Sequence, residues 1–280
     1  MLKRSILLLS ACGLALAGCS KKDAETAAPP PADAADADMA AAAGSMPAAL
    51  DFAAIAAAAV GDSRRLQADR AEDERRKPAA ALEFFQAGPG MAIFELEAGG
   101  GWYTELLSSI AGPGGSVVMQ NPDGFLAFVG EQIDARLKDG RLANVRQSLS
   151  NFDALDAADA SIDVATWVQG PHELYYTPGE GQILGDPAKS YAEIFRILKP
   201  GGVFAVIDHS AVAGAPEAVG HTLHRVDRAV VVAMAEAAGF KLESESDFLA
   251  NPDDSRTVTV FDPAIRGKTD QFALRFRKPL

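Results

Sequence analysis

Short apolar runs alternate with longer amphipathic segments from residue 91 onward, and this pattern constrains the fold more than any other feature. The run 91–95 is typical of a buried strand, and it leads through a glycine-rich turn at 98–101 into a helical segment at 102–110. We expect further strands at 117–119, 145–149, 162–168, 203–207, 242–246 and 272–276, and helices at 125–137, 191–198 and 225–238. Such alternation predicts a single α/β domain with a doubly wound, mostly parallel, seven-stranded sheet. Ligands of these sheets bind outside the carboxyl ends of the strands.

The composition excludes several classes of protein. The chain has 26 Lys and Arg against 38 Asp and Glu, a formal net charge of -12, and no basic run offsets the acidic residues. Because a nucleic-acid duplex repels such a charge, we expect no nucleic-acid partner. Both cysteines lie within the first 19 residues, which excludes a disulfide framework and a four-cysteine zinc site.

The amino terminus is typical of an export signal. Two basic residues precede an apolar run at 6–16, which is shorter than the roughly 20 residues that span a bilayer. The following LAGC resembles the lipobox of bacterial lipoproteins, which implies cleavage after residue 18 and lipidation of Cys19. The alternative is an ordinary signal peptide with an incidental cysteine. Ser20 favours the outer membrane, so we expect a lipid anchor on the periplasmic side of the cell envelope.

Two further segments precede the alternating region. Residues 19–47 are rich in Ala, Pro and Asp and have few large apolar side chains, which is typical of a disordered tether. We place the folded domain at 48–280 and expect it to begin with a helical cap. The cap includes a charged segment at 64–77 that breaks at Pro78.

Three motifs in the alternating region resemble those of class I S-adenosylmethionine-dependent methyltransferases. They are MAIFELEAGGGWYTELLSSI, SIDVATWVQGPHEL and EIFRILKPGGVFAVIDHS, in the order of that family. The WYTE stretch and the RGKTDQF tail resemble an exported bacterial lipoprotein group of predicted methyltransferases. The resemblance implies a Rossmann-like fold, S-adenosylmethionine as cofactor, and methyl transfer to a small molecule or an envelope component.

The resemblance also assigns cofactor-binding positions around the first glycine-rich turn. Glu95 stands where the family has the acidic residue that ends the first strand, and Gly99 and Gly101 match the second and third glycines of its loop. Glu97 occupies the position of the first glycine.

Two later positions complete the implied cofactor site. Asn121 stands where the family has the acidic residue that binds the ribose hydroxyls. Asn151, with Phe152 beside it, stands near the family's residue that contacts the adenine amino group. The replacements at Glu97, Asn121 and Asn151 favour an alternative, a non-catalytic ligand-binding or scaffolding lipoprotein that kept the fold.

The four histidines supply the candidate catalytic groups. His172 follows the fourth expected strand and is our first candidate for a general base; His209 follows the fifth and is the second. Structural roles for both stay open. His221 and His224 are three residues apart, so a metal-dependent hydrolase using them with Asp208 or His209 is a weaker alternative. We expect no metal.

Overall fold

The computed structural model describes residues 49–177, 179 and 183–280. The expected signal peptide at 1–18, Cys19 and the whole tether at 19–47 lie outside this part of the chain. Within the described residues, no helix combines the length and the apolar character that crossing a membrane requires.

A seven-stranded sheet organises the domain, in the order β3-β2-β1-β4-β5-β7-β6. The strands are β1 (Ala92–Leu96), β2 (Ser116–Gln120), β3 (Val145–Ser148), β4 (Ile162–Val168), β5 (Leu198–His209), β6 (Lys241–Ser246) and β7 (Gln271–Arg277). Only β7 runs antiparallel to its neighbours within this sheet. The prediction of a doubly wound, mostly parallel seven-stranded sheet is therefore confirmed. The strand order reverses between β1 and β4, which is where ligands of such sheets bind.

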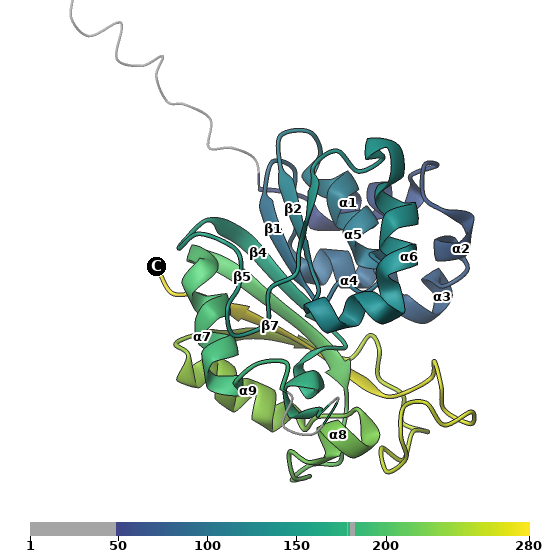
Figure 1. The fold of residues 1–280 in the computed structure, drawn as a ribbon, viewed down its shortest axis with the longest axis vertical. Helices are drawn as coiled ribbons and strands as arrows, with labels where there is room; N and C mark the ends of the chain where they lie inside the picture. Colours follow the sequence, from purple (N-terminus) through teal and green to yellow (C-terminus); the bar gives the residue numbers. More distant parts are fainter. Residues whose placement is uncertain (1–48, 178, 180–182) are drawn as a thin grey trace, which may run out of the picture. The chain divides into compact units, whose positions relative to one another are not determined.

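Helices cover both faces of the sheet (Figure 1). One face carries α1 (Phe52–Gly61), α4 (Pro78–Phe85), α5 (Trp102–Ala111) and α6 (Leu126–Leu137), preceded by the short helices α2 (Gln67–Arg70) and α3 (Asp73–Arg76). The other face carries α7 (Pro187–Ile197) and α9 (Arg228–Ala237), with α8 (Val219–Leu223) nearby. Three 3-10 turns complete the described part of the chain: η1 (Asp123–Phe125), η2 (Lys138–Gly140) and η3 (Pro171–Tyr175).

Some element boundaries differ from the sequence prediction. The charged segment at 64–77 forms two short helices rather than one, and Pro78 begins α4 because proline suits the first turn of a helix. The turn that we expected after α7 is instead part of β5. This strand begins at Leu198, because Leu198 pairs with Ile162 of β4 ahead of a register shift. The expected helix at 225–238 starts at Arg228, where the Asp227 side chain accepts a hydrogen bond from the Ala229 amide.

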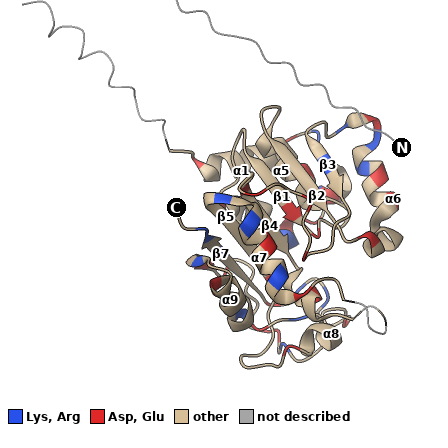
Figure 2. Cartoon of the chain, turned by 60° about the vertical axis from the view of Figure 1, so that its left-hand side comes forward, with Lys and Arg blue, Asp and Glu red and all other residues tan. Residues whose placement is uncertain are grey.

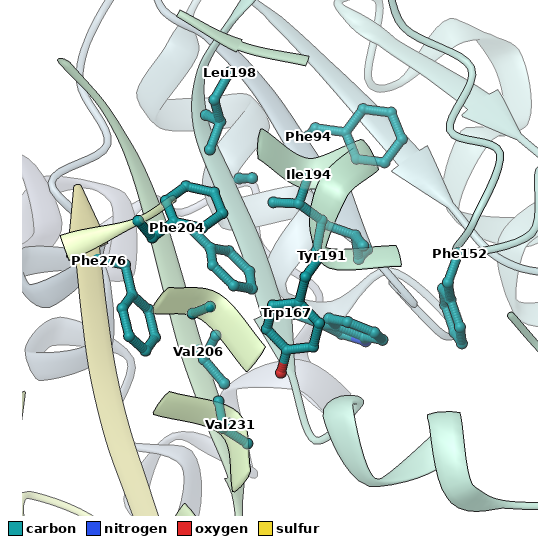
Figure 3. Packing of buried hydrophobic residues seen from close by; sticks show 14 of the residues in the cluster. Phe94, Phe152, Trp167, Tyr191, Ile194, Leu198, Phe204, Val206, Val231 and Phe276 are labelled. Atoms are coloured by element: carbon teal, nitrogen blue, oxygen red, sulfur yellow. The ribbon is translucent and has the colours of Figure 1, made fainter. Parts of the chain in front are cut away.

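The core on the α7 and α9 side of the sheet is rich in aromatic side chains (Figure 3). Trp167 is fully buried, and its ring centroid lies 4.8 Å from that of Phe152 and 6.3 Å from that of Tyr191. This packing fixes the carboxyl end of β4. In the view of Figure 2, basic and acidic residues are both distributed over the domain.

Candidate functional site

The turn after β1 is pinned to the end of β2 by amide side chains. The Asn121 Oδ1 atom accepts from the Gly99 amide at 2.8 Å, and its Nδ2 atom donates to the Gly99 carbonyl at 3.1 Å. The Gln120 Oε1 atom accepts from the Glu97 amide at 2.9 Å. Glu97 itself has a φ of 50°, so this side chain occupies the left-handed backbone conformation that usually favours glycine. Asn121 therefore holds the turn in place, and both of its polar groups are engaged.

A cavity of about 620 Å³ lies beside this turn, at the carboxyl ends of β1 and β4. Its wall includes Glu95, Glu97 and Gly99 of the predicted cofactor residues. The rest of the wall comes from the N-terminal helices, α6, and the segments around Glu173, His224 and Phe261. A cavity at this edge matches the place where doubly wound sheets bind their ligands.

The other predicted cofactor residues lie away from the cavity wall. Asn121 and Phe152 are fully buried, and Phe152 belongs to the aromatic core shown in Figure 3. Asn151 is exposed. A Cβ atom on Gly101 would approach the Arg136 Cδ atom to 2.6 Å, so this glycine permits α6 to pack closely against the turn.

Two carboxyl groups of the cavity wall have raised pKa values. Glu95 is 4% exposed, its Oε2 atom accepts from the Thr104 hydroxyl, and burial raises its pKa to about 8. The Glu97 Oε2 atom accepts from the Trp167 indole N–H at 3.0 Å, and burial together with the Glu173 carboxylate raises the Glu97 pKa well above its ordinary range. Both groups are thus predominantly protonated at neutral pH, and the wall beside the turn carries less negative charge than the sequence indicates.

Arg76 adds a positive charge to the cavity wall. Its guanidinium carbon lies 4.7 Å from the centroid of the Trp102 ring, over which it stacks. The buried Arg76 Nε atom has no hydrogen-bond partner among the described residues. Burial lowers the pKa of Arg76. An anionic ligand group would supply the missing acceptor.

A cluster of imidazoles and carboxylates lies next to the cavity. The His172 Nδ1 atom is 2.7 Å from Asp208 Oδ1, and the His172 amide donates to Asp208 Oδ2. The Glu173 Oε1 atom lies 3.2 Å from both His172 Nε2 and His224 Nδ1. Glu173 and His224 line the cavity, while the His172 side chain is buried behind them.

Charge governs the protonation of this cluster. Burial alone would lower the His172 pKa, but the Asp208 and Glu173 carboxylates outweigh burial and raise it to about 10. Burial alone would raise the Glu173 pKa, but hydrogen bonds from His172 and His224 lower it to about 2. His172 therefore carries a proton at neutral pH and is stabilised between two carboxylates.

The remaining histidines have separate surroundings. The His209 Nδ1 atom is 2.7 Å from the Thr269 hydroxyl, and burial lowers the His209 pKa to about 3. His221 stacks on Tyr176, with ring centroids 5.6 Å apart, and its Nδ1 atom accepts from the Thr177 amide. The fold does not gather His221 and His224 into one donor set. The candidate donor set within the described residues is His172, Glu173 and His224.

Sequence reasoning did not assign Arg76 or Glu173 to the site. Glu173 directly follows His172, so adjacent titratable residues after a strand were a usable signal. Nothing in the sequence distinguishes Arg76 from the other charged residues of its segment. The roles predicted for His172 and His209, and for the cofactor positions, stay predictions.

Comparison with known proteins agrees with this architecture. No known family profile matches the chain. The chain is 28% identical over 132 residues to the ubiquinone/menaquinone biosynthesis C-methyltransferase UbiE of Hydrogenovibrio crunogenus, covering 47% of each protein. It is 28% identical over 129 residues to UbiE of Legionella pneumophila strain Paris. The chain spans about half the length of the curated relatives it matches.

Two solved structures show the same fold. One is a SAM-dependent methyltransferase from Aquifex aeolicus, with a TM-score of 0.52 and 20% identity over 82% of this chain and all of that one. The other, from Mesorhizobium loti, has a TM-score of 0.52 and 16% identity over 74% of this chain and 99% of that one. This chain has the class I methyltransferase fold. It is distantly homologous to UbiE, so its cavity lies at the ligand-binding edge of a methyltransferase fold.

Proposed function

We propose that the chain transfers a methyl group from S-adenosylmethionine to an acceptor bound in the cavity beside the turn 98–101. The observation that carries this proposal is the cavity itself, because it lies at the carboxyl edge of a class I methyltransferase fold and touches Glu95, Glu97 and Gly99. S-adenosylmethionine supplies a methyl group that is already activated for transfer. The chain's task is then to hold cofactor and acceptor in the right orientation.

The residues of the cavity fit the methionine end of this cofactor. The unpartnered Arg76 Nε atom offers a charge-assisted hydrogen bond to a carboxylate. The raised pKa of Glu97 keeps that side chain from repelling the same carboxylate. We therefore assign the methionine end to the space between Arg76 and the turn.

The acceptor would occupy the side of the cavity near Glu173 and Tyr176. Phe128 and Phe261 line the same cavity and are 80% and 52% exposed, so its rim is apolar and accessible. This supports an acceptor with an apolar portion, either a small molecule or an envelope component. A proton released by the acceptor would be accepted by the Glu173 carboxylate, which lines the cavity. His172 contacts this carboxylate and already carries a proton, so it would stabilise Glu173 rather than take the proton itself.

Membrane attachment is part of the proposal. The lipobox-like LAGC supports a lipid on Cys19, which would hold the enzyme at the periplasmic side of the outer membrane. An apolar acceptor in the membrane would then lie close to the anchored enzyme.

A second function is favoured by one specific observation. Both polar groups of Asn121 bond to the Gly99 backbone, and this residue is fully buried outside the cavity wall, so it presents no group to a ribose in the cavity. Asn151 lies on the surface rather than in the cavity wall. A ligand-binding or scaffolding lipoprotein without methyl transfer is the function that these two residues support.

Calorimetric titration of the detergent-solubilised full chain with S-adenosylmethionine and S-adenosylhomocysteine tests both functions. The enzyme proposal expects micromolar binding, on the order of -8 kcal/mol, and radiolabelled methyl transfer into envelope extract. Arg76→Met should weaken binding at least about tenfold, since it removes a charge-assisted hydrogen bond. Its neighbour Arg75, which pairs with Glu72 on the surface, provides the control Arg75→Met.

The outcomes separate the two functions. A folded chain that binds neither compound at millimolar concentration contradicts the enzyme proposal and favours the non-catalytic one. Binding without methyl transfer to any envelope fraction also favours a binding protein.

A further inference from the structure

The cluster beside the cavity has the composition of a metal site. Two imidazoles and one carboxylate, from His172, Glu173 and His224, each place a donor atom within 4.8 Å of the other two. Nitrogen and oxygen donors of this kind bind first-row divalent cations, and two histidines with one glutamate form a known open zinc site.

The distances between donor atoms suit a tetrahedral cation. The Glu173 Oε1 atom lies 3.2 Å from His172 Nε2 and 3.2 Å from His224 Nδ1. In a tetrahedral zinc site with bonds near 2.1 Å, neighbouring donor atoms are about 3.4 Å apart. Two edges of the tetrahedron are therefore already close to their final length.

The third edge depends on His224. This ring is partly exposed, at 17% for the side chain, and it ends α8 with a φ of 53°. It therefore has more freedom to adjust than His172, which is held on both sides.

Asp208 prepares His172 as a ligand. Its carboxylate lies 2.7 Å from His172 Nδ1 and also accepts from the His172 amide, which fixes both the ring and the backbone. A proton on Nδ1 leaves Nε2 as the donor atom that faces Glu173. Metal-binding histidines usually have a carboxylate or carbonyl on the other ring nitrogen in this way.

The local charge also favours a cation. The Glu173 Oε1 atom lies 3.2 Å from His172 Nε2, and the Asp208 Oδ1 atom lies 2.7 Å from His172 Nδ1, so two carboxylates flank this ring. A divalent cation bound by His172, Glu173 and His224 would offset the negative charge of these carboxylates.

The fold brings the ligands together through a close contact between α8 and η3. A Cβ atom on Gly220 would lie 2.6 Å from the His172 carbonyl oxygen and 2.8 Å from the Tyr175 Cβ atom. Only glycine allows α8 to approach η3 this closely, and this approach places His224 beside Glu173.

We propose that His172, Glu173 and His224 bind a divalent transition-metal ion, with zinc as the cation that suits the donor set best. Glu173 and His224 line the cavity, so the coordination positions that the protein leaves open would face bound ligands. Water or an oxygen atom of a ligand would complete the coordination. The site does not depend on methyl transfer, and each can be present without the other.

The test uses the full chain, without a polyhistidine tag, after chelator treatment. Titration with Co²⁺ should give a visible absorption band from bound cobalt, and reconstitution with zinc should give close to one zinc per chain by elemental mass spectrometry. Zinc should also raise the melting temperature of the wild-type chain, since it binds only the folded state.

Variants identify the ligands. His224→Ala should weaken Co²⁺ binding at least roughly 100-fold, because losing even an outer partner of a metal ligand costs about 10–100-fold. His221→Ala, three residues earlier on α8, is the matched control and should change affinity less than about threefold. Both histidines are at least partly accessible, so both variants should fold, which circular dichroism and the metal-free melting temperature would verify.

Three results would overturn the site: no stoichiometric metal in the wild-type chain, no shift of its melting temperature with zinc, or equal losses in the two variants. Glu173→Gln provides a second ligand test, in which the side-chain volume is kept and the anionic donor is lost. Retained affinity in this variant would also contradict the assignment.

Discussion

The Glu95 carboxyl group, buried at the end of β1, makes stability depend on pH. Burial raises its folded-state pKa from 4.5 to about 8. Between these values the folded state holds a proton that the unfolded state has released, so stability should fall as pH rises through this window. The slope from this group is at most about 1.4 kcal/mol per pH unit. Glu95→Gln should remove it, measured as urea unfolding free energies at pH 5, 6.5 and 8.

The control for this prediction is Glu83→Gln on the exposed face of α4. It should retain the wild-type pH dependence, since other groups contribute equally to both chains. A Glu95→Gln chain whose stability still falls with pH as steeply as the wild type would show that Glu95 is ionised in the folded state.

Asn121 is a structural residue of the turn, and its replacement by the family's acidic residue should be harmful. Asn121→Asp turns the group that donates to the Gly99 carbonyl into an acceptor, within a fully buried site. We expect a loss of about 1–3 kcal/mol of stability and no gain in affinity for S-adenosylmethionine. Chemical unfolding and calorimetry would measure both.

The exposed Asn151 provides the matched control. Asn151→Asp should change stability by less than about 0.5 kcal/mol. If Asn121→Asp bound the cofactor more tightly at unchanged stability, position 121 would instead have the ribose-binding role that the family resemblance implies.

At the scale of elements, two glycines in helices should respond oppositely to alanine. Gly130 lies inside α6 with open space around it, so Gly130→Ala should stabilise the chain by about 0.5–1 kcal/mol through helix propensity. Gly220→Ala in α8 forces a methyl group against the His172 carbonyl and should cost about 1–3 kcal/mol. Thermal unfolding of the two variants checks the sign. Equal shifts would mean that α8 does not press on η3.

The elements that the sequence predicted well are those whose residues are buried on both sides. β1 and β4 lie in the middle of the sheet, so their apolar runs are continuous and their positions were predicted closely. The short elements were not predicted, because α8 and η3 have five residues each and exist through their mutual packing. β5 was predicted too short, since its first residues become a strand only by pairing with β4 and β7.

The candidate site was predictable to the extent that it follows strand ends. His172 and His209 lie after β4 and at the end of β5, and Glu95 and Glu97 at the end of β1, as expected for a parallel sheet. Their partners were not predictable. Asp208 turns toward His172, and Asn121 turns into the glycine turn rather than toward a ligand, because each satisfies buried polar groups that only the folded chain brings together.

At the scale of the whole molecule, the chain is acidic, with a formal net charge of -12, and no helix among the described residues is long and apolar enough to cross a membrane. Lipid on Cys19 is the proposed attachment. Cys19→Ser should move the protein from the membrane fraction to the soluble fraction, because the variant loses the residue that would carry the lipid. Stable anchoring needs two or more lipid signals. Cys12→Ser, within the apolar run, should leave it in the membrane fraction. Metabolic labelling with palmitate and fractionation would measure this, and membrane retention of an unlabelled Cys19→Ser chain would contradict the anchor.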